Sequence, residues 1–208
     1  SGNKVRKLEY LLASAIKERA EYIFTCGGEQ SNHARATVIA AAKFDFKTRI
    51  FLWGKGNKSP EGNLFLCKYF GAEIIYLTKK EYENVNVIMT DERMQLVKKG
   101  RRVFVIPEGG STTAGIMGYV DFVDELQNQI NLKSVDGIVT SAGTGGTAAG
   151  ILAGLAHKNL PLKVYAVNVL YSKEEITKKI LMLAEACTLE NNLKGKLNYK
   201  NLIVLDGY

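Results

Sequence analysis

Cysteine, histidine and proline are scarce in this sequence of 208 residues. Its three cysteines and two histidines are far apart and form no C-x-x-C pair. Neither a disulfide framework nor a zinc or other metal site is therefore expected. Unpaired cysteines suit a reducing compartment, so we expect a cytoplasmic protein. Only 3 prolines and 20 glycines argue against a long disordered linker.

Long apolar runs are also missing, although residues 137–156 contain no charge. Gly146, Gly150 and Gly154 recur there every four residues, as in some transmembrane packing motifs. The centre of the run is rich in Gly, Ser and Thr, where a spanning helix would have larger apolar residues. We expect a buried strand, a loop and a small-residue helix, and no membrane span.

The net charge of +7 does not indicate a nucleic-acid partner. The densest basic run, residues 98–102, lies where a helix should end, and the helix dipole favours cations there. No aromatic residues interleave with it as they would on a base-stacking surface. A solvated face is the better interpretation, and its field would mildly favour an anionic cofactor or substrate.

Short β-branched or aromatic runs alternate with helical patterns along the whole chain. Strands are expected at 22–25, 49–52, 73–77, 103–106, 137–140, 164–169 and 202–205, and helices at 5–20, 32–44, 60–69, 82–99, 114–131, 146–157 and 173–187. This alternation predicts an α/β protein with parallel sheets covered by helices on both faces. A Gly-rich break at 107–113 is the best domain boundary. Ligands in such folds bind beyond the carboxyl ends of the strands.

The first loop of interest, residues 25–33, follows a strand and opens a helix. On a purely structural interpretation it is a strand-to-helix turn, with Ser31 as the N-cap of the helix. On the functional interpretation, its many polar side chains and the amides of the helix start bind an anion. The residues alone do not decide between the two.

The second loop, Ser141-Ala142-Gly143-Thr144-Gly145-Gly146-Thr147, lies between a strand and a small-residue helix. Successive glycine amides at a helix start, with two Thr hydroxyls, predict a phosphate cradle. Gly143-x-Gly145-x-x-Ala148 also matches the dinucleotide fingerprint, so a dinucleotide-binding oxidoreductase is an alternative. That alternative expects an acid about 20 residues on, whereas the next strand ends at Asn168 and Val169.

Physical reasoning alone does not distinguish Lys4 from the other lysines. However, Gly-Asn-Lys-x-Arg-Lys-Leu-Glu-Tyr at 2–10, Cys-Gly-Gly-x-Gln-Ser-Asn-His-x-Arg at 26–35 and Gly-Thr-Gly-Gly-Thr at 143–147 follow in order. This series resembles the D-cysteine desulfhydrase and 1-aminocyclopropane-1-carboxylate (ACC) deaminase family. These are pyridoxal-phosphate (PLP) enzymes of fold type II, the tryptophan-synthase-β-like fold. The match extends over essentially the whole chain.

The resemblance assigns roles to residues that the sequence alone leaves undistinguished. It makes Lys4 the Schiff-base lysine and gives Asn32 a hydrogen bond to the PLP ring hydroxyl. Ser31 matches a serine that acts as nucleophile or proton relay, and Lys7 is expected at the cofactor phosphate or the substrate carboxylate. The residues expected to bind the PLP phosphate are Gly143, Thr144, Gly145, Gly146 and Thr147.

The resemblance also implies a reaction, the α,β-elimination of D-cysteine to pyruvate, ammonia and sulfide. ACC deamination and a non-catalytic PLP- or phosphate-binding module are the alternatives. The Gln30-Ser31-Asn32-His33 run is closer to the desulfhydrase pattern, but Glu29 departs from both patterns, where an apolar residue is usual. A carboxylate beside the reaction centre would change the substrate choice.

The family's organisation predicts a smaller domain at 7–112 and a larger PLP-binding domain at 1–6 and 113–208. The latter would be incomplete, because the family has a strand region before Gly-Asn-Lys and a tyrosine-bearing substrate loop near its C-terminus. We therefore expect a chain truncated at both ends, with an exposed apolar face on its second domain. A small amino acid is the expected substrate and a homodimer the expected assembly.

Overall fold

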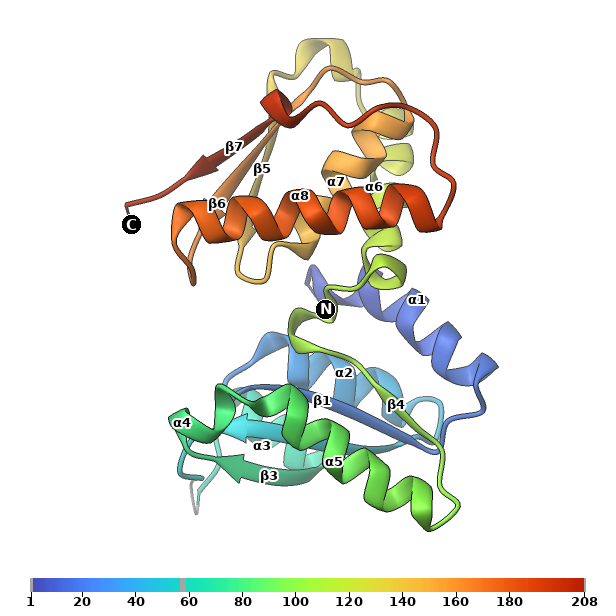
Figure 1. The fold of residues 1–208 in the computed structure, drawn as a ribbon, viewed down its shortest axis with the longest axis vertical. Helices are drawn as coiled ribbons and strands as arrows, with labels where there is room; N and C mark the ends of the chain where they lie inside the picture. The colour runs from blue at the N-terminus through green and yellow to red at the C-terminus, as the bar shows by residue number, and fades with distance from the viewer. Residues whose placement is uncertain (1, 57–58, 208) are drawn as a thin grey trace. The chain divides into compact units, whose positions relative to one another are not determined.

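The computed structural model describes residues 2–56 and 59–207, apart from the side chain of residue 133. The chain divides into two compact units, Ser1–Gly110 and Ser111–Tyr208 (Figure 1). Each unit has its own parallel sheet and its own hydrophobic core, as the β-α alternation predicts. Among the described residues, no helix is both long enough and apolar enough to cross a membrane.

The first unit is built on a four-stranded sheet of order β3-β2-β1-β4, in which all neighbouring strands run parallel. Its strands are β1 (Tyr22–Gly28), β2 (Lys47–Trp53), β3 (Glu73–Leu77) and β4 (Val103–Val105). Its helices are α1 (Lys4–Lys17), α2 (Asn32–Ala42), α3 (Gly62–Tyr69), α4 (Lys79–Tyr82) and α5 (Val85–Lys98), followed by a 3-10 turn at Glu108–Gly110.

Side chains of this sheet alternate between two covered faces. Ile23 on β1 packs with α1 and α2, and Ile50 on β2 packs with α2 and α3. Their neighbours Phe24 and Phe51 lie on the opposite face with α5, and their ring centroids are 5.4 Å apart. The first unit is therefore a three-layer αβα sandwich, as predicted.

The second unit has a three-stranded parallel sheet of order β5-β6-β7. Its elements are β5 (Gly137–Ala142), β6 (Lys163–Asn168), β7 (Leu202–Leu205), α6 (Thr113–Gln129), α7 (Gly146–His157) and α8 (Lys173–Glu190), with 3-10 turns at Leu132–Ser134 and Tyr199–Asn201. The run at 137–156 thus forms a strand, a loop and a helix, which confirms that interpretation.

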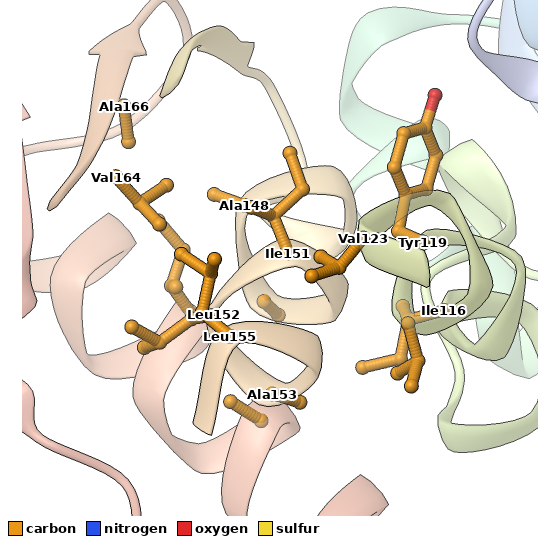
Figure 2. Close-up of a cluster of buried hydrophobic side chains, with 14 of the residues drawn as sticks. Ile116, Tyr119, Val123, Ala148, Ile151, Leu152, Ala153, Leu155, Val164 and Ala166 are labelled. Carbon is orange, nitrogen blue, oxygen red and sulfur yellow. The ribbon is translucent and has the colours of Figure 1, made fainter. Parts of the chain in front are cut away.

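The core of the second unit lies between its helices and one face of the sheet. Figure 2 shows Ile116 of α6, Ile151 of α7 and Val164 of β6 in one cluster, which α8 also joins. The other face carries side chains such as Val139 of β5, which is 68% exposed. An apolar face is therefore exposed on this unit, as expected.

Two elements differ from the sequence prediction in a way that affects the site. β1 continues to Gly28, because Cys26 is a small, fully buried side chain and residues 26–28 pair with Phe51–Trp53 of β2. The helix predicted at 82–99 is two helices, α4 and α5. Thr78 caps α4 in a capping box with Glu81, so the chain starts a separate short helix before Tyr82.

Candidate active site

Ser31 stands between the end of β1 and the first turn of α2. Its backbone is extended, and its Oγ accepts a hydrogen bond from the backbone N of Ala34 (3.1 Å). Ser31 is therefore the N-cap of α2, as its position predicts. A serine hydroxyl can accept one bond and donate another, so the cap does not use up its capacity to donate.

Lys4 occupies the first turn of α1, with its side chain half-buried. Burial lowers the pKa of its amine, while the carboxylate of Glu108 acts in the opposite direction. A lower pKa increases the fraction of neutral amine, which is the form that can attack a carbonyl or accept a proton. The environment of Lys4 therefore favours its neutral form, and its role as the Schiff-base lysine stays a prediction.

Lys7 lies one turn beyond Lys4 on the same helix and is 1% exposed. Its Nζ donates a hydrogen bond to the carbonyl oxygen of Gly109 (3.1 Å). Burial, and then the positive charge of Lys4, lowers the pKa of Lys7 to about 7. The structure thus places Lys7 inside the first unit, and contact with a phosphate or carboxylate stays a prediction.

His33 and Thr25 form a buried pair, and His33 is close enough to Lys4 and Lys7 for their charges to affect it. The two side chains share a hydrogen bond of 2.9 Å between Thr25 Oγ1 and His33 Nε2. Burial and the charges of Lys4 and Lys7 lower the pKa of His33 to about 3, against a hydrogen bond with the Pro107 backbone that raises it. The imidazole is therefore neutral at physiological pH.

Sequence reasoning assigned no role to His33 or Thr25. The available signal was a threonine in the middle of β1, eight residues before a histidine in the first turn of α2. Since a strand and the helix after it pack together, the two side chains were candidates for one hydrogen bond.

A second polar group lies on the opposite face of the sheet. The Tyr82 hydroxyl donates to Glu108 Oε1 (2.9 Å) and also interacts with the Cys26 thiol. Burial raises the pKa of Cys26 to about 12 and also raises the pKa of Tyr82. Both groups therefore stay protonated at physiological pH.

Glu29 contacts the chain segment between β2 and α3. Its Oε1 accepts a hydrogen bond from the backbone N of Gly56 (2.7 Å). One oxygen of the carboxylate is therefore committed to this segment. An effect of Glu29 on substrate choice stays a prediction.

Asn32 is exposed at the start of α2, and its Oδ1 accepts a hydrogen bond from Asn63 Nδ2 (3.1 Å). Asn63 lies in the first turn of α3 and was not among the residues that the sequence singled out. The amide of Asn32 retains two N–H donors, which suit an anionic oxygen such as that of the PLP ring.

The glycine loop lies in the second unit, between β5 and α7. Gly145 caps α7 with a left-handed backbone (φ 81°), and a Cβ there would lie 2.8 Å from Ile180 Cγ1. The hydroxyls of Thr144 and Ser111 are 2.7 Å apart, and Thr147 is buried in the first turn of α7. Backbone amides at a helix start beside hydroxyl groups are suited to a phosphate.

The dinucleotide alternative expects an acid at the end of the strand next to β5, and that strand, β6, ends at Asn168 and is followed by Val169. The acid nearby, Asp206, follows β7, and its Oδ1 accepts a hydrogen bond from Asn168 Nδ2 (3.1 Å). Within residues 2–56 and 59–207, no group of three or more His, Cys, Asp or Glu side chains could hold a metal ion.

Comparison with known proteins identifies the family. The model of the family described as "Pyridoxal-phosphate dependent enzyme" matches residues 1–186. A Thermotoga maritima protein, named as a candidate ACC deaminase, is 47% identical over 169 residues, which are 81% of this chain and 54% of that protein. The mitochondrial bifunctional D-cysteine desulfhydrase/ACC deaminase of Arabidopsis thaliana is 36% identical over 180 residues, 81% of this chain and 45% of the plant protein.

The chain therefore spans about half the length of these relatives. Solved structures agree with the sequence matches. The crystal structure of an ACC deaminase homologue has a TM-score of 0.89 at 33% identity, and the match covers 98% of this chain and 62% of that one. An O-ureido-L-serine synthase, with a TM-score of 0.67 at 14% identity, shares the fold. The resemblance is confirmed, and the chain belongs to the family of pyridoxal-phosphate-dependent enzymes with the type II fold.

Proposed function

We propose that this chain carries the catalytic lysine and the cofactor contacts of a PLP-dependent lyase acting on a small amino acid. D-cysteine is the leading substrate, with the overall reaction D-cysteine and water to pyruvate, ammonia and hydrogen sulfide. The observation that carries the proposal is the pair of lysines on α1, where Lys7 is 1% exposed and Lys4, one turn before it, is half-buried. Burial lowers the pKa of both amines. Perturbed amines of this kind cluster at catalytic sites.

The described residues fit the cofactor in three respects. Lys4 is an amine of lowered pKa, Asn32 offers N–H donors, and the loop from Gly143 to Thr147 offers amides at the start of α7. When bound, PLP supplies an electron sink for the negative charge that develops at the substrate Cα. We assign the cofactor's covalent attachment to Lys4, its ring oxygen to Asn32 and its phosphate to the glycine loop.

The chain's own residues then supply the proton transfers. Once Lys4 is free, its neutral amine is the base that takes the α-proton, and burial favours that neutral form by lowering the pKa of Lys4. The positive charge of Lys4 in turn helps burial to lower the pKa of Lys7. Ser31, which retains its hydroxyl hydrogen, is the proposed proton relay or nucleophile.

ACC deamination is the second candidate, and the names of two relatives favour it. The Arabidopsis relative is named for both activities and the Thermotoga relative for the deaminase alone. ACC has no α-proton, so a Lys4 base alone would not open its ring, and Ser31 would have to supply the additional push. Replacing Ser31 with Ala should therefore reduce ACC turnover more than D-cysteine turnover.

Several features of the whole protein stay predictions. We propose a smaller domain at 7–112 and a larger domain formed by 1–6 and 113–208, although residues 4–6 form the first turn of α1. We also propose a homodimer, a cytoplasmic location and no nucleic-acid partner. Sedimentation, cell fractionation and a DNA-binding assay would test these.

The first experiment is an absorbance spectrum of the chain with PLP, before and after borohydride reduction, followed by mass mapping. A visible band that reduces onto Lys4 supports the proposal, and Lys4→Ala should abolish it. Lys17→Ala, an exposed lysine of the same helix, is the matched control. A band without pyruvate formation would favour a non-catalytic module, and NAD binding without label on Lys4 would favour the oxidoreductase.

A further inference from the structure

The hydrogen bonds of Asn63 determine which way its own side-chain amide and that of Asn32 are oriented. Asn63 Nδ2 donates to the backbone carbonyl oxygen of Gln30 (2.8 Å) and to Asn32 Oδ1 (3.1 Å). A backbone carbonyl can only accept, so the Asn63 atom that faces Gln30 must be its NH2 group. The atom of Asn32 that faces the same NH2 group must then be its oxygen.

Two further bonds fix the position of Asn63 itself. Its backbone N donates to Gln30 Oε1 (2.9 Å), and Gln30 Nε2 donates to the backbone carbonyl oxygen of Glu61 (3.2 Å). Both ends of the Gln30 amide are thus assigned by backbone groups. Gly62 allows this approach, since it has φ 56° and a Cβ there would lie 2.7 Å from Gln30 Oε1.

The helix that carries Asn63 is firmly held in the first unit. Leu64, the next residue, is 1% exposed and packs with Ile50 and Leu52 of β2 and with Val38 of α2. Asn63 therefore presents its amide from a core-anchored position, although Asn32 itself is exposed.

We propose that Asn63 is a positioning residue that fixes the side-chain amide of Asn32 with its oxygen inward and its NH2 group free for the cofactor's ring oxygen. The inference rests on the proposed function, because it assumes that Asn32 contacts PLP. Without Asn63, the Asn32 amide can rotate and turn its oxygen toward the ring oxygen of the cofactor, and the two oxygens repel each other. Asn63 would act through Asn32 alone, without touching the reacting atoms.

The test compares Asn63→Ala with Asn86→Ala, a matched control at an exposed asparagine of α5 in the same unit. PLP should bind about 3- to 10-fold more weakly to Asn63→Ala, as expected for one lost hydrogen bond. When PLP is linked to Lys4 and the linking nitrogen has lost its proton, the negative charge on the ring oxygen has no neighbouring positive charge. The NH2 group of Asn32 stabilises the ring oxygen most in that form. Its loss should therefore raise the pH midpoint of the visible band by about 0.5 to 1 unit.

A double variant separates positioning from a general structural effect. If Asn63 works through Asn32, then Asn63→Ala should change neither PLP affinity nor the pH midpoint further in an Asn32→Ala background. Additive effects would overturn the inference, and so would an Asn63→Ala variant that behaves like Asn86→Ala. A wild-type chain that forms no band on Lys4 would instead overturn the proposed function, and this inference with it.

One measurement needs no variant and therefore does not depend on how a variant folds. NMR of the wild-type chain without PLP should show slow exchange of the Asn63 side-chain amide protons with solvent, because both are engaged. The side-chain amide protons of Asn32 should exchange fast. The reverse pattern would refute the assigned orientation.

Discussion

Replacing Lys7 with Met should make the chain more stable, and by an amount that depends on pH. Lys7 is 1% exposed, and burial lowers its pKa from 10.5 to about 7. The unfolded chain therefore binds a proton at Lys7 up to about pH 10.5, whereas the folded chain binds it only below about 7. Between these values the unfolded state holds more protons, so stability falls as the pH falls.

The magnitude follows from the same two values. At about 1.4 kcal/mol per pH unit, burial of the Lys7 charge lowers the free energy of unfolding by about 5 kcal/mol below pH 7. About 3 kcal/mol of this loss occurs as the pH falls from 9.5 to 7. Met keeps the length of the side chain but cannot donate to the Gly109 carbonyl, which costs about 1–3 kcal/mol at every pH. The two proteins should be close in stability at pH 9.5, and Lys7→Met should be the more stable by about 3 kcal/mol at pH 7.

Urea denaturation of both proteins without PLP at the two pH values measures this difference. Lys17→Met, at an exposed position of the same helix, is the control and should show no such widening. Titration of His33 contributes little between pH 7 and pH 9.5, because its pKa is below 7 in both the folded and the unfolded chain. A stability difference that stays the same at pH 9.5 and pH 7 would refute the assignment of Lys7 as a buried amine of lowered pKa.

Three further predictions concern other parts of the site. His33→Leu should lower stability at pH 7 by about 1–3 kcal/mol, because Thr25 Oγ1 loses its partner. In acid titrations the same variant should lose less stability than wild type between pH 6.5 and about 3, the window in which only the unfolded wild type protonates His33. Glu108→Gln should lower the pKa of Lys4 further, seen as a lower pH midpoint for amine labelling at Lys4; no change would exclude Glu108 as its counter-charge. Gly145→Ala should weaken PLP binding at least 10-fold and destabilise the second unit, because residue 145 has φ 81° and its new Cβ would lie 2.8 Å from Ile180 Cγ1. Unchanged PLP binding would argue against this loop as the phosphate site.

The sequence predicted the parallel α/β architecture well, because apolar periodicity and loop position depend on local residues. The strand at 73–77 and the helix at 146–157 were placed with the bounds that the structure has. The end of β1 was missed, since Gly27 and Gly28 read as a turn until their pairing with Leu52 and Trp53 is known. Hydrogen bonds between distant segments, such as the bond from Lys7 to Gly109, leave no periodic signal in the sequence.

The candidate site divides in the same way. Lys4 and Asn32 were found through motifs of a known family, and Ser31 also through its place as an N-cap. His33 stood within a motif but was given no role, because its burial next to two lysines depends on how α1 and α2 pack. Asn63 lies in the first turn of another helix, where only the hydrogen bonds to Gln30 and Asn32 reveal its importance.

The buried cluster of the first unit bears on whether the chain is catalytic or merely binds phosphate. A phosphate-binding module needs backbone amides and fully charged lysines, since a neutral amine attracts phosphate less strongly. In this chain, burial lowers the pKa of Lys4 and Lys7, and their charges help to keep His33 neutral. Burial of the positive charges reduces stability, and the lowered pKa of Lys4 weakens its attraction for an anion while it helps Lys4 to act as nucleophile and base. The buried lysine pair therefore supports the proposed enzyme over the proposed binding module.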